Sequence, residues 1–471
     1  MSSLSPSFAR PARVPRLPQA ALSPARTRAK PERAGAGARF LLLSLVFIQF
    51  FPIPRFGIFV VAPENILFFF ALIYLLLFGL RALHSQGKVL AMLGLMLLYG
   101  LLDQFHNLYL GRDVSPPMEI IRTVVYLAMF CVVCRYEAEQ VSMLRTLLIV
   151  GVLQVLFGSL VYFIGEPFAS IRAWMNGTRL GFGSDDPFIA KGSQMAGLYC
   201  LPSVFAYLIA SFPLLGVILT HIRNNRLWLL LSVFMLIGVL LNAERSAMAA
   251  IALTYGLWSI KTGQKLSNLL ALLFFLGAAA GIGLGIKQYQ PDLRNPHEHG
   301  SYAHGDLSDR LEGTNAKEVG GRLMWQVYGA LSVLKSPLLG PSQAEYAAEM
   351  LHMAKPSAAD IARVPPPHNH YVNIGMHAGI GGWLIFAYWL KLLLGLNKAT
   401  TARLTDRPTL SSLHLGIGLA LLAAMLNGLF HNAGVFSPEL ATSSLLGLLL
   451  AQSYLAVPEP ARSSRVARAF R

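Results

Sequence analysis

Charged residues are scarce in this sequence. Asp, Glu, Lys and Arg make up 13% of its 471 residues, whereas hydrophobic residues make up 54%. An ordinary soluble domain has a charged fraction of about 25%, so the composition excludes that class. It indicates a polytopic membrane protein of the all-α class, because a bilayer-spanning helix satisfies its own backbone hydrogen bonds.

Cysteine is also rare. The three cysteines, Cys131, Cys134 and Cys200, all lie in apolar segments. Their number and positions argue against a disulfide framework, and Cys131-x-x-Cys134 lacks the context of a redox or zinc site. We interpret all three as small packing residues.

Acidic residues are outnumbered by basic ones, 23 to 39, which gives a formal net charge of +16. The basic residues are divided among short loops and two tails and form no single stripe with interleaved aromatics, so we expect no nucleic-acid partner. Residues 1–38 predict a disordered basic cytoplasmic tail, and residues 457–471 predict a second basic cytoplasmic tail.

About twelve apolar runs are long enough to span a bilayer, which takes about 17 to 25 residues. They lie near residues 40–60, 63–80, 89–104, 117–134, 144–165, 194–220, 227–243, 246–260, 268–286, 371–394, 412–430 and 435–456. We therefore expect an N-terminal transmembrane bundle over 39–286 and C-terminal transmembrane helices over 371–456. Between the ninth and tenth spans lies a large, partly helical loop, residues 287–370.

The short loops set the orientation. Lys and Arg are concentrated in the loops and tails that would share one side with the N-terminus, and the positive-inside rule assigns that side to the cytoplasm. Both termini are then cytoplasmic. The 287–370 loop lies outside, which in a bacterial inner membrane is the periplasm.

The loop contains signals for two helices. Apolar residues recur with helical spacing from Val319 to Lys335 and predict a helix at the outer membrane interface. Ser342-Gln343-Ala344-Glu345 is a capping box that predicts a second helix, ending near Lys355. Three prolines, 365–367, stiffen the approach to His368.

Several motifs share the outer side in this topology, and together they resemble the bacterial O-antigen ligase and polymerase superfamily. The motifs are Arg179 with Gly181, Glu244-Arg245-Ser246, Gly321-Arg322 with Trp325, Pro337 to Gly340, His368-Asn369-x-Tyr371, and Gly379-x-Gly381. The resemblance covers about residues 170–450.

The resemblance implies a glycosyltransferase that uses an undecaprenyl-diphosphate-linked glycan and an acceptor hydroxyl, with no cofactor, metal or nucleotide sugar. His368 is the candidate base, because a neutral imidazole accepts a proton near neutral pH. Arg179, Arg245 and Arg322 are the candidate diphosphate clamp, because guanidinium groups bind phosphate oxygens bidentately. The residues that follow His368, namely Asn369, His370 and Tyr371, are the candidate supporting residues.

Each site residue also has a structural interpretation. Histidine at a membrane interface commonly serves as a hydrogen-bonding anchor, and for His370 we favour a structural polar stripe with Asn373 and His377. Arg245 has Glu244 as a neighbouring ion-pair partner, and arginine is common on interfacial helices such as the one predicted around Arg322.

The function has three interpretations. A ligase transfers the glycan to lipid A core, and a polymerase transfers it to the next lipid-linked repeat of an O-antigen or exopolysaccharide. The donor motifs do not separate these two, and we favour the ligase. A flippase or other transporter of lipid-linked oligosaccharide is the competitor from another class, but the span centres contain no Asp, Glu, Lys or Arg of the kind ion-coupled transporters use.

Overall fold

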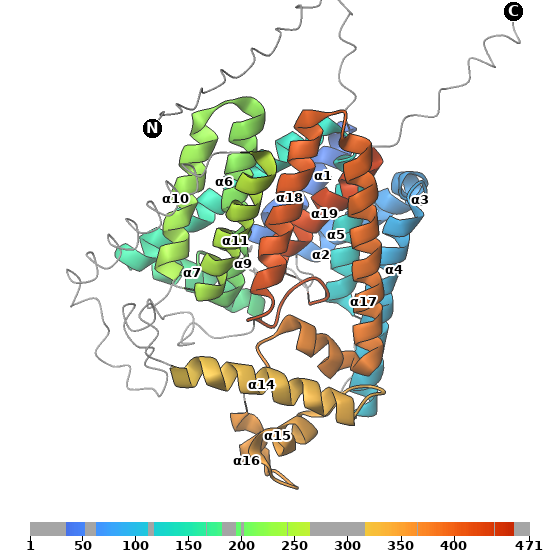
Figure 1. Ribbon diagram of the computed structural model, residues 1–471, viewed down its shortest axis with the longest axis vertical. Helices are drawn as coiled ribbons and strands as arrows, with labels where there is room; N and C mark the ends of the chain where they lie inside the picture. The colour runs from blue at the N-terminus through green and yellow to red at the C-terminus, as the bar shows by residue number, and fades with distance from the viewer. Residues whose placement is uncertain are drawn as a thin grey trace, which may run out of the picture. The chain divides into compact units, whose positions relative to one another are not determined.

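A computed structural model describes most of the chain as helices (Figure 1). The described residues are 34–51, 63–111, 117–165, 167–180, 195–198, 202–242, 244–263, 316–364, 366–437 and 439–455. These ranges contain no β-strand, so the all-α class is confirmed for this part of the chain. The predicted span 268–286, the N-terminal tail through residue 33 and the 457–471 tail lie outside the described residues.

The helices follow the predicted order. They are α1 (Ala36–Phe50), α2 (Pro63–Tyr74), a π-helical turn (Leu75–Gly79), α3 (Leu80–His84), α4 (Gly87–Tyr109), α5 (Met118–Val133), α6 (Glu137–Phe163), α7 (Phe168–Leu180), α9 (Pro202–Arg223), α10 (Arg226–Asn242), α11 (Arg245–Thr262), α14 (Ala316–Lys335), α15 (Gln343–Leu351), α16 (Ala358–Arg363), α17 (His370–Leu404), α18 (Pro408–Asn427) and α19 (Leu440–Leu455).

Six helices in the described ranges are long and apolar enough to cross a membrane. They are Glu64–His84, Gly87–Tyr109, Glu137–Phe163, Ser203–Arg223, His370–Leu404 and Pro408–Asn427. Three shorter apolar helices are α1, α10 and α19. The membrane character is thus as predicted, whereas the count of twelve spans and the side of the 287–370 loop stay predictions.

Helix α18 packs against α9, α11, α17 and α19. Its contact with α9 is close because Gly416 has no side chain: a Cβ there would lie 2.3 Å from Cγ1 of Ile218. Small residues allow such approach between membrane helices, for which apolar surface alone gives little driving force. The neighbours of α18 are therefore held by close packing of the helices.

Two of the differences from the predicted helices have local reasons. Helix α7 was not predicted, because its 13 residues are too short to span and its mean hydropathy is low. The predicted span from residue 194 was wrong at its start. Gly197 has a left-handed φ of +60° and α9 begins only at Pro202, where a fixed φ suits the first turn of a helix.

Helix α17 is interrupted near its start, which the prediction of a continuous span over 371–394 missed. Gly379 has φ +60° and ψ −157°, a region essentially restricted to glycine. The N–H of Ile380 donates to the carbonyl oxygen of Pro337 at 2.9 Å, in the turn that follows α14. Figure 1 shows α17 changing direction at its beginning. The turn after α14 therefore replaces a hydrogen bond that the interruption removes.

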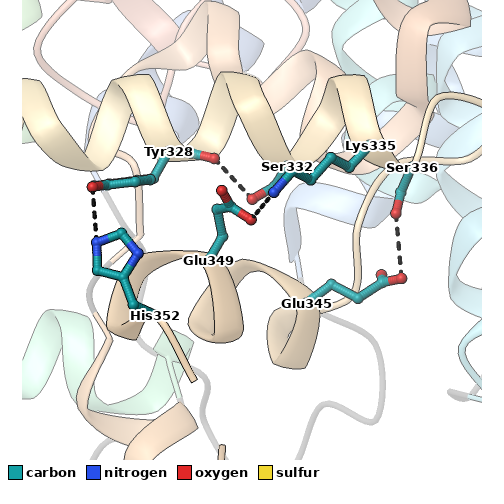
Figure 2. Close-up of polar contacts among 7 residues, drawn as sticks. All are labelled: Tyr328, Ser332, Lys335, Ser336, Glu345, Glu349 and His352. Atoms are coloured by element: carbon teal, nitrogen blue, oxygen red, sulfur yellow. Dashed lines mark hydrogen bonds and ion pairs between the residues drawn. The ribbon is translucent and has the colours of Figure 1, made fainter. Parts of the chain in front are cut away.

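The described part of the 287–370 loop has a core of its own. Buried residues of α14, of α15, directly after α16 and at the start of α17 form it: Val333, Tyr346, Ala347, Val364 and Met376. Helices α14 and α15 run side by side and exchange polar contacts, which Figure 2 shows. The hydroxyl of Tyr328 lies 3.1 Å from Nε2 of His352. The hydroxyl of Ser336 donates to Oε1 of Glu345 at 3.2 Å. Lys335 forms an ion pair with Glu349.

The two helix signals in this loop are confirmed, with one corrected end. Helix α14 spans the predicted segment, and the Ser342 capping box is present. The second helix does not reach Lys355, because His352 takes a left-handed φ of +53° that ends α15. A separate short helix, α16, follows and begins with its own capping box at Ser357.

Replacing Gly379 by Ala is expected to destabilise the protein by about 1–3 kcal/mol. A Cβ there would lie 2.4 Å from the carbonyl oxygen of Pro337. Thermal unfolding in detergent measures the effect. The matched control is Gly381→Ala, since its Cβ would meet Leu102 at an ordinary 3.6 Å. Equal melting temperatures for the two variants would contradict the role assigned to Gly379.

Replacing Tyr346 by Ala is expected to destabilise the α14–α15 unit by about 3–5 kcal/mol, because a large buried ring leaves a cavity. Lys335→Ala is the matched control. It removes an ion pair whose lysine is 65% exposed and is expected to cost no more than about 1 kcal/mol. Limited proteolysis within residues 316–364 measures both. Similar cleavage rates in the two variants would show that the small core does not hold the unit together.

Candidate functional site

His368 occupies a defined position immediately before α17. It is half-buried and has a left-handed φ of +50°, which is uncommon for a residue with a side chain. Its ring centroid lies 5.6 Å from that of Trp325 on α14. Pro367 is buried against Gly329, where a Cβ would lie 3.0 Å from the proline ring. These contacts with α14 hold the chain on both sides of the histidine.

Asn369 joins three elements. Its Oδ1 accepts from the N–H groups of Tyr371 and Val372 at 2.9 and 3.1 Å and so caps α17. Its Nδ2 donates to Oε1 of Gln326 on α14 at 3.2 Å and to the carbonyl oxygen of Leu429 at 3.0 Å. A single amide thus fixes the start of α17 against α14 and the end of α18.

His370 is enclosed by the segment that connects α18 and α19. Its backbone N–H donates to the carbonyl oxygen of Gly428 at 2.8 Å. Its ring nitrogen Nε2 accepts from the backbone N–H of Phe436 at 3.3 Å. A Cβ on Gly434 would lie 2.5 Å from the ring. With 1% of its surface exposed, the imidazole holds the connecting segment and does not reach a substrate in this conformation.

Two further residues at the start of α17 contact other helices. The hydroxyl of Tyr371 donates to the carbonyl oxygen of Met425 on α18 at 2.7 Å. His377, which we expected to share a polar stripe with His370, contacts Asp103 of α4 at 3.0 Å. The two histidines therefore have different neighbours. All three candidate supporting residues, Asn369, His370 and Tyr371, bind residues at or near the end of α18.

Helix α11 begins in a buried polar cluster. The hydroxyl of Ser246 donates to Oδ1 of Asn427 at 2.6 Å and lies 3.3 Å from Nε2 of His431. That nitrogen is 4.0 Å from a carboxylate oxygen of Glu244. The ring of Tyr207 on α9 lies 5.8 Å from the His431 ring. Asn427, His431 and Tyr207 were not among the candidate site residues, because none of them lies within a family motif in the sequence.

The three candidate arginines are placed by their helices alone, because their side chains lie outside the described part of the structure. Arg245 is the first residue of α11, between Glu244 and Ser246 of the cluster. Arg322 lies one turn before Gln326 on α14. Arg179 is in the last turn of α7, which packs against α6. The described contacts therefore connect the helices of Arg245 and Arg322 to His368.

The ionisable side chains of the site show whether it could bind a metal ion. Within the described ranges, no three His, Cys, Asp or Glu side chains are grouped so that they could hold a metal ion. Tyr346, whose pKa is raised by burial, keeps its proton and donates to the carbonyl oxygen of Trp325 at 3.4 Å. Among the described side chains, the Trp325 ring lies beside His368, and the adjacent Asn369 contributes an amide group.

Comparison with protein families agrees with this arrangement. The model of the O-antigen ligase family matches residues 230–387. This segment contains Arg245, Arg322 and His368, and it ends inside α17. No curated protein sequence matches the chain. The match over residues 230–387 supports membership of the O-antigen ligase superfamily, a family that implies a membrane enzyme of the glycosyltransferase type.

Proposed function

We propose that the protein transfers a glycan from undecaprenyl diphosphate to a hydroxyl group of lipid A core, at the periplasmic face of a bacterial inner membrane. Roughly twelve helices span that membrane in the proposal, with both termini in the cytoplasm. The observation that carries it is the common partner of three elements of the family-matched segment. The start of α11, the middle of α14 and the start of α17 all bind the end of α18.

The reaction replaces one bond to the anomeric carbon with another. The acceptor hydroxyl oxygen attacks that carbon, the bond from the carbon to the diphosphate oxygen breaks, and undecaprenyl diphosphate leaves with the bonding electrons. His368 accepts the proton of the hydroxyl. Its ring lies beside that of Trp325, and the residues before and after it, Pro367 and Asn369, contact α14. This support suits a base that must meet a bound hydroxyl.

Positive charge stabilises the leaving diphosphate. Arg179, Arg245 and Arg322 supply it, because guanidinium groups remain charged and bind phosphate oxygens in pairs. Helix α11 also begins here, without a side-chain cap, and the N–H groups of a first helical turn favour an anion. Such preorganised charge acts where negative charge develops in the transition state.

The proposed donor makes further cofactors unnecessary. The sugar is already joined to a good leaving group, so no nucleotide sugar is required, and the arginines take the part that a metal ion takes in many glycosyltransferases. Surrounding membrane lipids hold the undecaprenyl chain. The acceptor sugar reaches the site from the periplasm.

Replacing His368 by Ala is expected to lower the rate of transfer by a factor of about 10² to 10⁴, because the acceptor loses its base. The measurement is a reconstitution in liposomes with undecaprenyl-diphosphate glycan and lipid A core. His352→Ala is the matched control, since His352 is an exposed histidine of the same loop that contacts Tyr328. It is expected to retain wild-type transfer.

The same reconstitution separates the alternatives. Longer lipid-linked chains in the absence of lipid A core would identify a polymerase. Movement of the lipid-linked glycan across the bilayer without any new glycosidic bond would identify a transporter. Full transfer by the His368 variant would rule out His368 as the base. The three arginines proposed to bind the diphosphate would then be tested by themselves.

A further inference from the structure

The end of α18 makes a series of contacts that the proposed reaction does not itself require. Three consecutive residues bind three different elements. The side chain of Asn427 binds Ser246 of α11, and the carbonyl oxygen of Gly428 accepts from the N–H of His370 at the start of α17. The carbonyl oxygen of Leu429 accepts from Gln326 of α14 at 3.2 Å and from Asn369 at 3.0 Å.

We propose that Asn427–Leu429 is a positioning element, and Asn427 a positioning residue, that fixes Arg245 relative to His368. The inference rests on the proposed function, because it assigns these two residues to one reaction. Arg245 directly precedes Ser246, and His368 is two residues before His370. The hydrogen bonds to Asn427, Gly428 and Leu429 therefore link the segment of one residue to the segment of the other.

Only one of the three links depends on a side chain at the end of α18. Gly428 and Leu429 contribute backbone carbonyl groups, which survive most substitutions, whereas Asn427 binds Ser246 through its amide. The hydroxyl of Ser246 donates to Oδ1 of Asn427 at 2.6 Å and so links α11 to the end of α18. The Asn427–Ser246 contact is thus the part of the element that mutation can test.

The burial of Asn427 favours a positioning role. The residue has no exposed surface, and among the described atoms its Nδ2 has no hydrogen-bond partner. A buried donor without a partner is unfavourable by about 1–3 kcal/mol. A leucine of similar size would avoid that penalty, so stability alone does not account for an asparagine at this position.

Misplacement of reacting groups has a large effect on rate. A displacement of about 1 Å costs on the order of 100-fold in rate. We therefore expect Asn427→Leu and Ser246→Ala each to lower kcat about 10- to 100-fold. The KM for the lipid-linked glycan is expected to change much less, because the arginines remain. Ser246→Thr keeps the hydroxyl and is expected to restore most of the activity.

A double-mutant cycle tests whether the two side chains act as one contact. Combining Asn427→Leu with Ser246→Ala is expected to lower kcat no further than either change alone, because each already removes the same hydrogen bond. Effects that multiply would show that the two residues act independently, and that result would overturn the proposal. A melting temperature of Asn427→Leu that is unchanged or higher, together with lower kcat, would exclude simple unfolding as the cause.

The matched control lies at the other end of the same helix. His414 is buried and contacts Gln452 of α19 at 2.6 Å, so His414→Leu removes a comparable polar contact of α18 far along the helix from residue 427. It is expected to leave kcat near the wild-type value. An equal loss of kcat in this variant would mean that any weakening of α18 lowers activity, and the positioning role would be rejected.

Hydrogen exchange gives a test that needs no glycan. The peptide covering residues 366–372 contains the N–H of His370 that binds Gly428. Its exchange is expected to accelerate in Asn427→Leu and Ser246→Ala and to stay unchanged in His414→Leu. Unchanged exchange in all variants would overturn the inference even if wild-type transfer is measured. Faster exchange with no transfer by the wild type would instead count against the proposed function alone.

Discussion

The interruption of α17 at Gly379 is the constraint on which the arrangement of this protein depends. A continuous helix would carry the residues before Gly379 straight on along the axis of the span. Instead, the backbone turns, and the carbonyl oxygen of Pro337 in the preceding loop accepts a hydrogen bond from the N–H of Ile380. The loop and the span are therefore joined by backbone groups, and the first residues of α17 are directed toward the end of α18.

The hydrogen bonds around His368 offset an unfavourable backbone. A left-handed φ costs a residue with a Cβ roughly 1–2 kcal/mol. The side chain of the next residue, Asn369, makes four hydrogen bonds, two to the first turn of α17 and two to neighbouring elements. A well-satisfied cap beside a strained residue is a means of holding a side chain in one orientation, and the stiff proline segment before it has the same effect.

Local patterns predicted those features that depend on neighbouring residues. The spacing of apolar side chains gave α14, the Ser342 capping box gave the start of α15, and Glu244 marked the turn between α10 and α11. The interruption of α17 was missed because its partner, Pro337, lies on another element. Asn427 was missed for the same reason: it meets Ser246 across 181 residues of sequence, and no periodicity encodes such a contact.

The position of the α18 end in the chain has a consequence for biogenesis. Residues 230–387 contain the candidate site residues Arg245, Arg322 and His368, and the ribosome completes them well before it reaches Asn427. Until α18 has entered the membrane, the starts of α11 and α17 lack the carbonyl and amide groups that join them. A nascent chain therefore carries these residues before the contacts that join their helices can form.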